Sequence, residues 1–369
     1  MKVLIAGGGT GGHVYPGISL AKELLKRNPE TDVLFIGTKK GLENSILAKE
    51  GFKLKRISVG GLKGKISVRT IVSLLKLPIG FLQSLWILLC YKPDIVIGVG
   101  GYVTGPVVSC AYILRIPIII QEQNFLPGVT NRILGIFADK IAISFKETED
   151  YFSKNKVIFT GNPIRREFLE QLKNGISNSN HSKFTLLIFG GSQGAQSINR
   201  AVIEGLEYLK EFKDSIRIIH QVGKGNEELM KKEYEKRCFL ASVQPFIYNI
   251  VDKYKEADLI ICRAGATTLS ELTVAGKASI LIPFPFSANN HQEINARKLQ
   301  MSGAAEMILE KDLTGEFLAK KILELMKDRG KLKDMCFKSK KMAVTDAAEK
   351  IIDICYSLIK KEEAVHGNC

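Results

Sequence analysis

Two stretches of the chain join an apolar run to a glycine-rich turn and then to a helical pattern, and they limit the possible folds more than any other feature. The first reads VLIAGGGTGGH from Val3, and the second reads LLIFGGSQGA from Leu186. Apolar, β-branched runs that alternate with helices are typical of a parallel sheet covered by helices on both faces. Because the pattern starts twice, the sequence predicts two α/β units.

Further apolar runs continue this pattern through both halves of the chain. Strands are expected at Val3–Ala6, Val33–Ile36, Ile95–Val99, Ile116–Ile120, Lys140–Ile143 and Val157–Thr160, and then at Thr185–Phe189, Ile216–His220, Phe239–Ala241, Leu259–Cys262 and Ala278–Ile282. The boundary between the units is placed near Pro163, which interrupts the pattern, and residues 345–360 form an amphipathic helical tail. A length of 369 residues agrees with two domains.

Three glycine loops follow apolar strands, at Gly7–His13, Gly100–Pro106 and Gly190–Ala195. Glycines allow backbone N–H groups to approach an anion, and the N-terminus of a following helix adds partial positive charge. One such loop is equally often structural, but three loops at strand ends favour a ligand cleft shared by the two units. A fourth turn, in Cys262–Glu271, opens a helix with two hydroxyl residues, and Glu271 could accept hydrogen bonds from ribose hydroxyls.

The first loop also matches the dinucleotide-binding pattern G-x-G-x-x-G. That pattern expects a carboxylate at the end of the second strand to hold a ribose, but the strand continues Gly37-Thr38-Lys39-Lys40 without one. Lys39 and Lys40 would suit a 2′-phosphate, so an NADP-dependent oxidoreductase remains a minority alternative. No loop is followed by the lysine of a nucleotide-triphosphate P-loop, which excludes that class.

The charge of the chain points to an anionic partner. Lys and Arg number 53 and Asp and Glu number 38, which gives a net charge of +15. Nucleic acid, a nucleotide sugar and an anionic bilayer would each fit this charge. A single Trp and the lack of zinc-ligand spacing disfavour nucleic acid. Seven scattered cysteines without a C-x-x-C pair, and no signal or spanning segment, indicate a cytosolic, reducing location.

Much of the excess charge lies in one segment. Residues 51–93 contain eight basic and no acidic residues, and they include the most apolar stretch of the chain, Leu74–Leu89. Apolar residues rimmed by basic ones are what peripheral attachment to an anionic membrane requires. Part of the stretch must instead pack beneath the sheet. The residues predicted to meet the membrane are Lys63, Lys65, Arg69, Leu75, Ile79 and Phe81.

Seven motifs occur in one order along most of the chain: GGGTGGHVYPG from Gly7, GGYVTGP from Gly100, QEQN from Gln121, GNPIR from Gly161, GGSQGA from Gly190, CRAGATTLSE from Cys262 and NNHQEINA from Asn289. Together they resemble the MurG family of peptidoglycan N-acetylglucosaminyltransferases, of glycosyltransferase family 28 type. The diacylglycerol glucosyltransferases are relatives that share parts of these motifs.

The resemblance implies a GT-B fold, with two Rossmann-like parallel-sheet domains facing a central cleft and a C-terminal helix returning to the N-terminal domain. Residues 1–162, with the helix at about 343–362, would form the acceptor and membrane-associating domain. Residues 163–342 would bind the UDP-sugar donor.

The reaction implied is inverting transfer of N-acetylglucosamine from UDP-N-acetylglucosamine to the C4 hydroxyl of undecaprenyl-pyrophosphoryl-N-acetylmuramoyl-pentapeptide. It would run at the cytoplasmic face of the cell membrane and need no cofactor, since no D-x-D motif suggests a metal. Other cell-wall synthesis proteins are further expected partners.

The resemblance also implies the site residues. His13 is the first candidate for general base, although it could only bind the acceptor pyrophosphate, and Glu122 is the second. Gln121 stands where histidine is common in the family. The expected donor-binding residues are Thr10, Gly11, Gly12, Asn124, Arg165, Ser192, Ile247, Ala266, Thr267, Thr268, Leu269, Ser270, Glu271 and Gln292.

Overall fold

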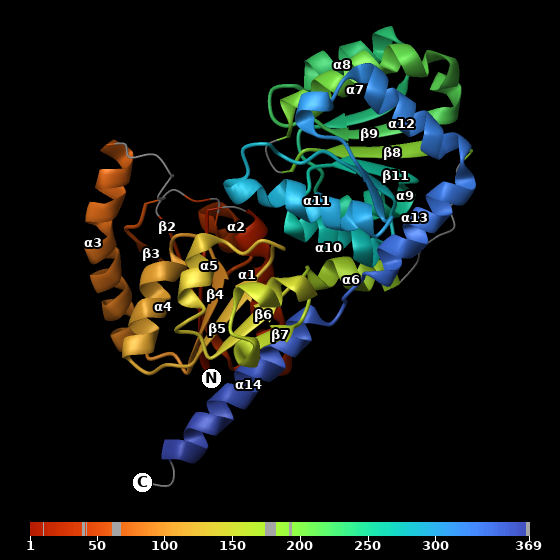
Figure 1. Ribbon diagram of the computed structural model, residues 1–369. Coiled ribbons are helices and arrows are strands. Elements are labelled where there is room, and N and C mark those ends of the chain that lie inside the picture. Colours follow the sequence, from red (N-terminus) through yellow and green to blue (C-terminus); the bar gives the residue numbers. More distant parts are fainter. Residues whose placement is uncertain are drawn as a thin grey trace. The chain divides into compact units, whose positions relative to one another are not determined.

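The computed structural model divides the chain into two compact units. It describes residues 1–9, 11–38, 41, 43–60, 68–173, 182–191 and 194–366, and of these it leaves the side chains of 68–76 and 362–366 undescribed. Unit 1 consists of Met1–Arg166 and Thr345–Cys369, and unit 2 of Glu167–Val344 (Figure 1).

Unit 1 is built on seven parallel strands in the order β3-β2-β1-β4-β5-β6-β7. This order places β1 and β4 in the centre, so the loops that follow them lie side by side. The strands are β1 (Lys2–Gly7), β2 (Asp32–Thr38), β3 (Lys53–Ile57), β4 (Ile95–Gly100), β5 (Ile118–Glu122), β6 (Lys140–Ile143) and β7 (Val157–Phe159).

Helices cover both faces of this sheet, as the buried strands require. Their bounds are α1 (Gly11–Arg27), α2 (Glu43–Lys49), α3 (Val68–Tyr91), α4 (Thr104–Ile113), α5 (Val129–Leu134), the 3-10 segments η1 (Lys146–Tyr151) and η2 (Lys154–Lys156), and α14 (Ala347–His366). Alternate residues of β1 divide between the faces: Ile5 belongs to a core with α1 and α14, whereas Leu4 belongs to a core with α3 and α4.

The C-terminal helix α14 packs on α1, which confirms the predicted return of the chain to the N-terminal unit (Figure 1). Ile351, Ile352 and Cys355 of α14 are fully buried in the unit 1 core. Arg27, at the end of α1, forms an ion pair with Asp353 at 2.5 Å and donates to the carbonyl of Glu349 at 3.0 Å.

Unit 2 has six parallel strands in the order β10-β9-β8-β11-β12-β13. The strands are β8 (Phe184–Phe189), β9 (Ile216–Gln221), β10 (Leu240–Gln244), β11 (Leu259–Cys262), β12 (Ser279–Leu281) and β13 (Ala305–Met307). The helices are α6 (Arg166–Lys173), α7 (Gln196–Leu209), α8 (Glu227–Lys236), α9 (Ile250–Glu256), α10 (Ala266–Ala275), α11 (His291–Met301), α12 (Gly315–Lys327) and α13 (Arg329–Lys341), with η3 (Lys210–Ser215), η4 (Ala288–Asn290) and η5 (Glu310–Asp312).

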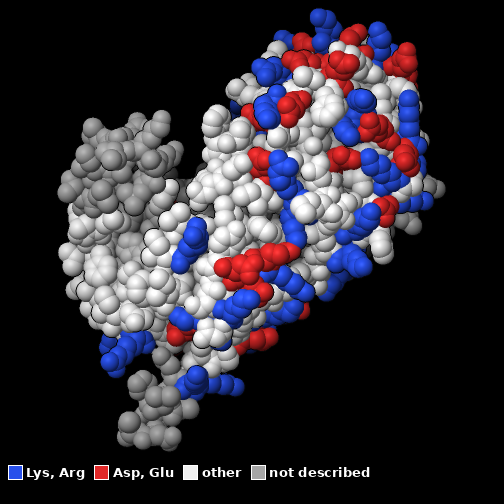
Figure 2. Space-filling model, in the orientation of Figure 1, with Lys and Arg blue, Asp and Glu red and all other residues white. Residues whose placement is uncertain are grey.

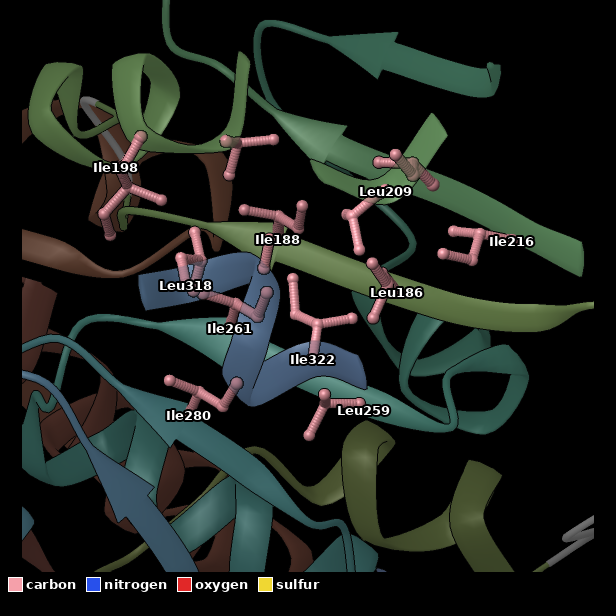
Figure 3. Close-up of a cluster of buried hydrophobic side chains, with 14 of the residues drawn as sticks. Leu186, Ile188, Ile198, Leu209, Ile216, Leu259, Ile261, Ile280, Leu318 and Ile322 are labelled. Carbon is pink, nitrogen blue, oxygen red and sulfur yellow. The ribbon is translucent and has the colours of Figure 1, made fainter. Parts of the chain in front are cut away.

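The main core of unit 2 lies between its sheet and the pair α7 and α12. Figure 3 shows Ile198 of α7 and Leu318 of α12 directed toward Ile188 and Ile261 of the central strands. Gly205 allows the two helices to approach closely, because a Cβ there would lie 3.0 Å from the carbonyl oxygen of Gly315.

The structure contains two strands that the sequence analysis did not predict, β3 and β13. In β3, the segment Lys53-Leu54-Lys55-Arg56-Ile57 has only Ile57 buried, because β3 lies at the sheet edge. Lys53 pairs with Asp32 at 2.8 Å, and Arg56 donates to Asn44 at 2.6 Å. Three of the eight basic residues in the predicted membrane segment therefore belong to an edge strand.

Candidate active site

The first two glycine loops of unit 1 are in direct contact. Gly100 and Gly101, at the end of β4, have φ values of +97° and +87°, a conformation that glycine adopts without strain. A Cβ on Gly101 would lie 2.6 Å from the carbonyl oxygen of Gly8. Glycine is therefore needed at this position both for its backbone conformation and for the approach of the two loops.

His13 lies on the first turn of α1, against the second glycine loop. A Cβ on Gly100 would be 2.8 Å from Cδ2 and 3.1 Å from Nε2 of His13, and 3.7 Å from Nδ2 of Asn131. The His13 ring is half-buried. This brings the candidate base to the carboxyl edge of β1 and β4, beside an asparagine on α5.

Glu122, the second candidate base, is buried at the end of β5, and donors occupy both of its carboxylate oxygens. Oε1 accepts from the backbone N of Asn124 at 2.8 Å and from its Nδ2 at 3.2 Å. Oε2 accepts from the backbone N of Gly128 at 3.1 Å and from Nδ2 of Asn131 at 2.9 Å.

Burial raises the pKa of Glu122 above the usual carboxyl range, against the opposing effect of these hydrogen bonds. All four partners are N–H donors, an arrangement that a carboxylate satisfies completely. Glu122 is thus placed to hold the loop 124–128 and Asn131, and its geometry fits a general base less well than that of His13 does.

Glu43, at the start of α2, is a second buried carboxylate, and it forms a hydrogen bond with the backbone of the first glycine loop. It accepts from the backbone N of Gly9 at 3.1 Å, and from the backbone N and the hydroxyl of Thr38 at 2.7 and 2.8 Å. Burial opposes its ionisation, but the hydrogen bonds from Thr38 and Gly9 keep the pKa of Glu43 below its usual range. A Cβ on Gly8 would lie 2.6 Å from its carboxylate.

Glu43 explains why the first loop resembles a dinucleotide site without its ribose-binding acid. The segment after β2 has no acid as far as Lys40, and the carboxylate that follows three residues later accepts a hydrogen bond from the loop. It takes up the Gly9 N–H instead of facing outward toward a ribose.

Arg165 lies in unit 1, next to the first loop. Its guanidinium stacks over the Tyr15 ring of α1, with 5.3 Å between the guanidinium carbon and the ring centroid. Tyr15 follows His13 by two residues, so Arg165 and His13 belong to neighbouring parts of the same sheet edge. Asn124, Gly11 and Gly12 also lie at this edge.

In unit 2, the third glycine loop joins β8 to α7. Gly191 and Gly194 have φ values of +93° and +74°. A Cβ on Gly194 would lie 2.5 Å from the carbonyl oxygen of Val222, directly after β9. The loop therefore packs on the end of the neighbouring strand, at the carboxyl edge of the sheet.

The turn between β11 and α10 places hydroxyls at a helix N-terminus. Ser270 donates to the carbonyl of Ala266 at 3.0 Å, so its hydroxyl belongs to the helix. The buried hydroxyl oxygen of Thr267 has no hydrogen-bond partner among the described residues. The first turn of α10 contains no acidic residue, which leaves its positive end available for an anion.

Glu271, one turn further along α10, is buried, with Tyr254 as a neighbour. The Tyr254 hydroxyl lies 3.5 Å from Oε2 of Glu271. Burial, and then the charge of Glu271, raise the pKa of Cys262. This carboxylate and the turn at Ala266–Leu269 are on one helix, as the sequence analysis expected from the motif.

Two further predicted donor residues lie at the same edge of unit 2. Ile247 is buried after β10, between the exposed Phe246 and Tyr248, whose rings are 5.0 Å apart. Gln292, on α11, accepts from the backbone N of Phe284 at 3.0 Å through its amide oxygen. Its amide nitrogen is then the group that could donate to a sugar hydroxyl.

Several predicted residues cannot be placed. Thr10, Ser192, Lys63 and Lys65 lie outside the described residues, and of Arg69 and Leu75 only the backbone of α3 is described. Phe81 was expected on the membrane surface, but it is partly buried against the unit 1 core. The helical repeat explains the difference, because residue 81 shares a face with the buried Ser84 and Leu88.

The parallel sheets with glycine loops at their carboxyl edges define the class of protein. Residues 3–143 match the N-terminal domain of glycosyltransferase family 28, and residues 185–351 match its C-terminal domain. The chain therefore belongs to glycosyltransferase family 28, and it has the GT-B fold.

Relatives that match almost the whole chain show which members of that family it is similar to. A Myxococcus xanthus protein and a Geobacter sulfurreducens protein are each 46% identical to it, over 367 and 364 residues. The alignments cover 100% and 98% of this chain and 95% and 100% of the relatives. Both relatives are UDP-N-acetylglucosamine–N-acetylmuramyl-(pentapeptide) pyrophosphoryl-undecaprenol N-acetylglucosamine transferases, that is, members of the MurG family.

Solved structures agree with this assignment. Acinetobacter baumannii MurG is 29% identical, with a TM-score of 0.79 over 96% of this chain and 99% of that one. A UDP-GlcNAc 2-epimerase from Neisseria meningitidis, bound to UDP-GlcNAc, is 14% identical with a TM-score of 0.65, over 96% of this chain and 99% of the epimerase. The epimerase shares the fold alone. The family match replaces the oxidoreductase alternative.

Proposed function

We propose that the protein transfers N-acetylglucosamine from UDP-N-acetylglucosamine to the C4 hydroxyl of undecaprenyl-pyrophosphoryl-N-acetylmuramoyl-pentapeptide, with inversion at the anomeric carbon. The observation that carries this proposal is the 46% identity to such transferases along the whole chain. The positions of the predicted site residues support it, because every one that is described, apart from the membrane residues, lies at the carboxyl edge of a parallel sheet or on the helix that follows one.

Each unit takes one part of the reaction in this proposal. Unit 1 would hold the acceptor, with His13 removing the proton of the attacking hydroxyl. Unit 2 would hold the donor, with Glu271 on the ribose and the backbone beside Ile247 on the uracil. Arg165 and the N-terminus of α10 would stabilise the charge that develops on the departing UDP. Gln292 would donate to the sugar.

The transfer assay uses a synthetic lipid-linked muramyl acceptor and a panel of UDP-sugars, including UDP-glucose. Transfer restricted to UDP-N-acetylglucosamine is expected. A chain that uses UDP-glucose equally well, or that transfers no sugar at all, would contradict the proposal.

The role of His13 is tested with His13→Ala. Removing a general base should lower kcat by about two to four powers of ten, because that is the usual contribution of such a group. The affinity for UDP should change far less, because a general base acts on the attacking hydroxyl and not on the nucleotide. Turnover that stays within about tenfold of the unmodified protein, roughly 1.4 kcal/mol, would exclude the role of base.

We also propose that unit 1 attaches to an anionic membrane surface. No helix among the described residues has the length and apolar composition to span a bilayer. Helix α3 instead exposes a stripe of four apolar side chains at helical spacing, from Ile79 at 50% exposed to Trp86 at 70%: Ile79, Leu82, Trp86 and Leu89.

The neighbouring helix α4 also exposes apolar side chains, Tyr112 and Ile113, both more than half exposed. The described surface over α3 and α4 is almost without charged side chains on the face shown in Figure 2, whereas over unit 2 the two signs are interspersed. An apolar stripe close to basic segments fits the interface of an anionic bilayer.

Sedimentation with vesicles of anionic lipid tests this attachment. Trp86→Ser with Leu82→Ser should reduce binding, and so should Lys63→Glu, Lys65→Glu and Arg69→Glu together. Phe337→Ser is the matched control, because this side chain is also exposed, at 68%, but belongs to unit 2. Equal binding by all of these variants would refute the proposed surface.

A further inference from the structure

Arg263 directly precedes the Ala264-Gly265 turn into α10, and it contacts three other segments at the carboxyl edge of unit 2. Its Nη1 donates to the carbonyls of Ile282 and Pro283, each at 3.2 Å. Its Nη2 donates to the hydroxyl of Ser197 at 2.9 Å and lies 2.5 Å from Oε2 of Glu310. Its side chain is only 11% exposed.

The partners of Arg263 are also joined to one another. The Ser197 hydroxyl, which accepts from Arg263, donates to Oε2 of Glu310 at 2.9 Å. The Glu310 carboxylate balances the charge of the arginine, and the Phe284 ring lies under the guanidinium at 5.3 Å. A planar guanidinium with five donors can meet all of these acceptors together, whereas a lysine ammonium cannot.

Two of the segments that Arg263 contacts lead to different parts of the proposed donor site. Ser197 is on the first turn of α7, directly after the third glycine loop. Ile282 and Pro283 lead into Phe284, whose backbone N–H donates to the amide oxygen of Gln292. Arg263 itself adjoins the phosphate-facing turn of α10.

We infer that Arg263 is a positioning residue for the UDP-sugar. It fixes the third glycine loop, on the diphosphate side, relative to the Gln292 segment, on the sugar side. This inference rests on the proposed function, since it takes a UDP-sugar as the ligand. Arg263 acts through its neighbours in this role, and it touches no reacting atom.

The ion pair of Arg217 and Glu256 provides a matched control. Its atoms are 2.9 Å apart and its side chains are 32% and 23% exposed. It lies at the opposite, amino edge of the same sheet, because Arg217 is near the start of β9 and Glu256 ends α9. Loss of this pair should lower stability without moving the donor segments.

The test compares Arg263→Met with Arg217→Met in the full-length protein. Both variants should lower Tm, but only Arg263→Met should raise the KM for UDP-N-acetylglucosamine, by about tenfold or more, with the acceptor KM within about twofold of the original. Unfolded protein lowers the maximal rate and leaves KM unchanged, so a structural defect alone cannot produce this result. A donor KM for Arg263→Met that stays within about twofold of that for Arg217→Met would overturn the inference.

A milder variant keeps the test valid if Arg263→Met fails to fold. Ser197→Ala removes only the contact with α7, so it should weaken UDP binding by about threefold or more and leave the ratio of UDP-N-acetylglucosamine to UDP affinity unchanged. Unchanged UDP binding by this variant would overturn the inference. An unmodified protein that neither binds UDP nor transfers sugar would instead contradict the proposed function.

Discussion

Replacing Glu43 with glutamine tests how strongly the first glycine loop depends on its buried carboxylate. The substitution keeps the shape of the side chain, and its amide oxygen can still accept from the backbone N and the hydroxyl of Thr38. The amide nitrogen then replaces the oxygen that accepts from Gly9. Two N–H donors would face each other in a buried site.

The magnitude follows from these contacts. One charge-assisted hydrogen bond is lost, worth about 1.5–3 kcal/mol, and a buried donor is left unsatisfied, at about 1–3 kcal/mol. Since part of the second cost is already counted in the first, we expect the loop and the ends of β1 and β2 to lose about 2–4 kcal/mol at pH 7. Because His13 follows this loop, kcat should also fall.

Hydrogen–deuterium exchange of peptides from β1 and β2 measures this loss locally, which avoids assuming two-state unfolding of a two-unit chain. Glu50→Gln is the control, because Glu50 pairs with Lys22 at 2.7 Å with both side chains about 30% exposed. A pair of this kind is worth about 0–1 kcal/mol.

The effect should also depend on pH in one direction. The folded-state pKa of Glu43 is lowered, so its contribution is present above the ordinary carboxyl pKa and disappears as pH falls through the lowered value. The difference between the two proteins should shrink on acidification below about pH 4.5. A difference below about 0.5 kcal/mol at pH 7, or one independent of pH, would refute the role assigned to Glu43.

Three further predictions concern Gly101, His220 and Ile351, which lie in tightly packed parts of the two units. Gly101→Ala should lose about 1–3 kcal/mol and most activity, because φ is +87° and the new Cβ would lie 2.6 Å from the carbonyl oxygen of Gly8. Gly105→Ala in α4 is the control, because its Cβ would meet open space, and it should be neutral or stabilising in thermal unfolding. His220 is fully buried and burial lowers its pKa to about 3, so its ring should stay neutral in NMR titration from pH 7 to 5; a midpoint near 6.5 would contradict this. Ile351→Ala, on the buried face of α14, should cost about 2–5 kcal/mol and raise exchange in α1, and unchanged exchange there would separate α14 from the core.

Most strands could be read from the sequence because their signal is local. Runs such as Val33–Ile36 and Leu259–Cys262 are apolar on both faces, which is typical of a covered parallel strand. The edge strands β3 and β13 carry no such run: β3 has only Ile57 buried, and β13 is three residues long and contains Glu306. The glycine loops and the hydroxyl-bearing start of α10 were likewise visible as residue types at fixed spacing, and so was the family.

The tertiary structure decided what the individual polar residues do. Glu43 accepts from the N–H of Gly9, which lies 34 positions before it, and Glu122 accepts from residues up to nine positions after it. Those partners make each carboxylate a support for a loop, and no local pattern could predict them. Arg263 was equally visible within its motif, yet its contacts with Ser197, Ile282 and Glu310 exist only after the strands are assembled.

Helix α3 shows the same division between what the sequence determines and what the packing determines. Sequence alone determined that residues 74–89 are apolar and lie beside basic residues, because composition and charge are properties of the chain. Packing against the sheet decided that Phe81 turns to the core and Trp86 to solvent, because only one face of a helix can be covered by one sheet.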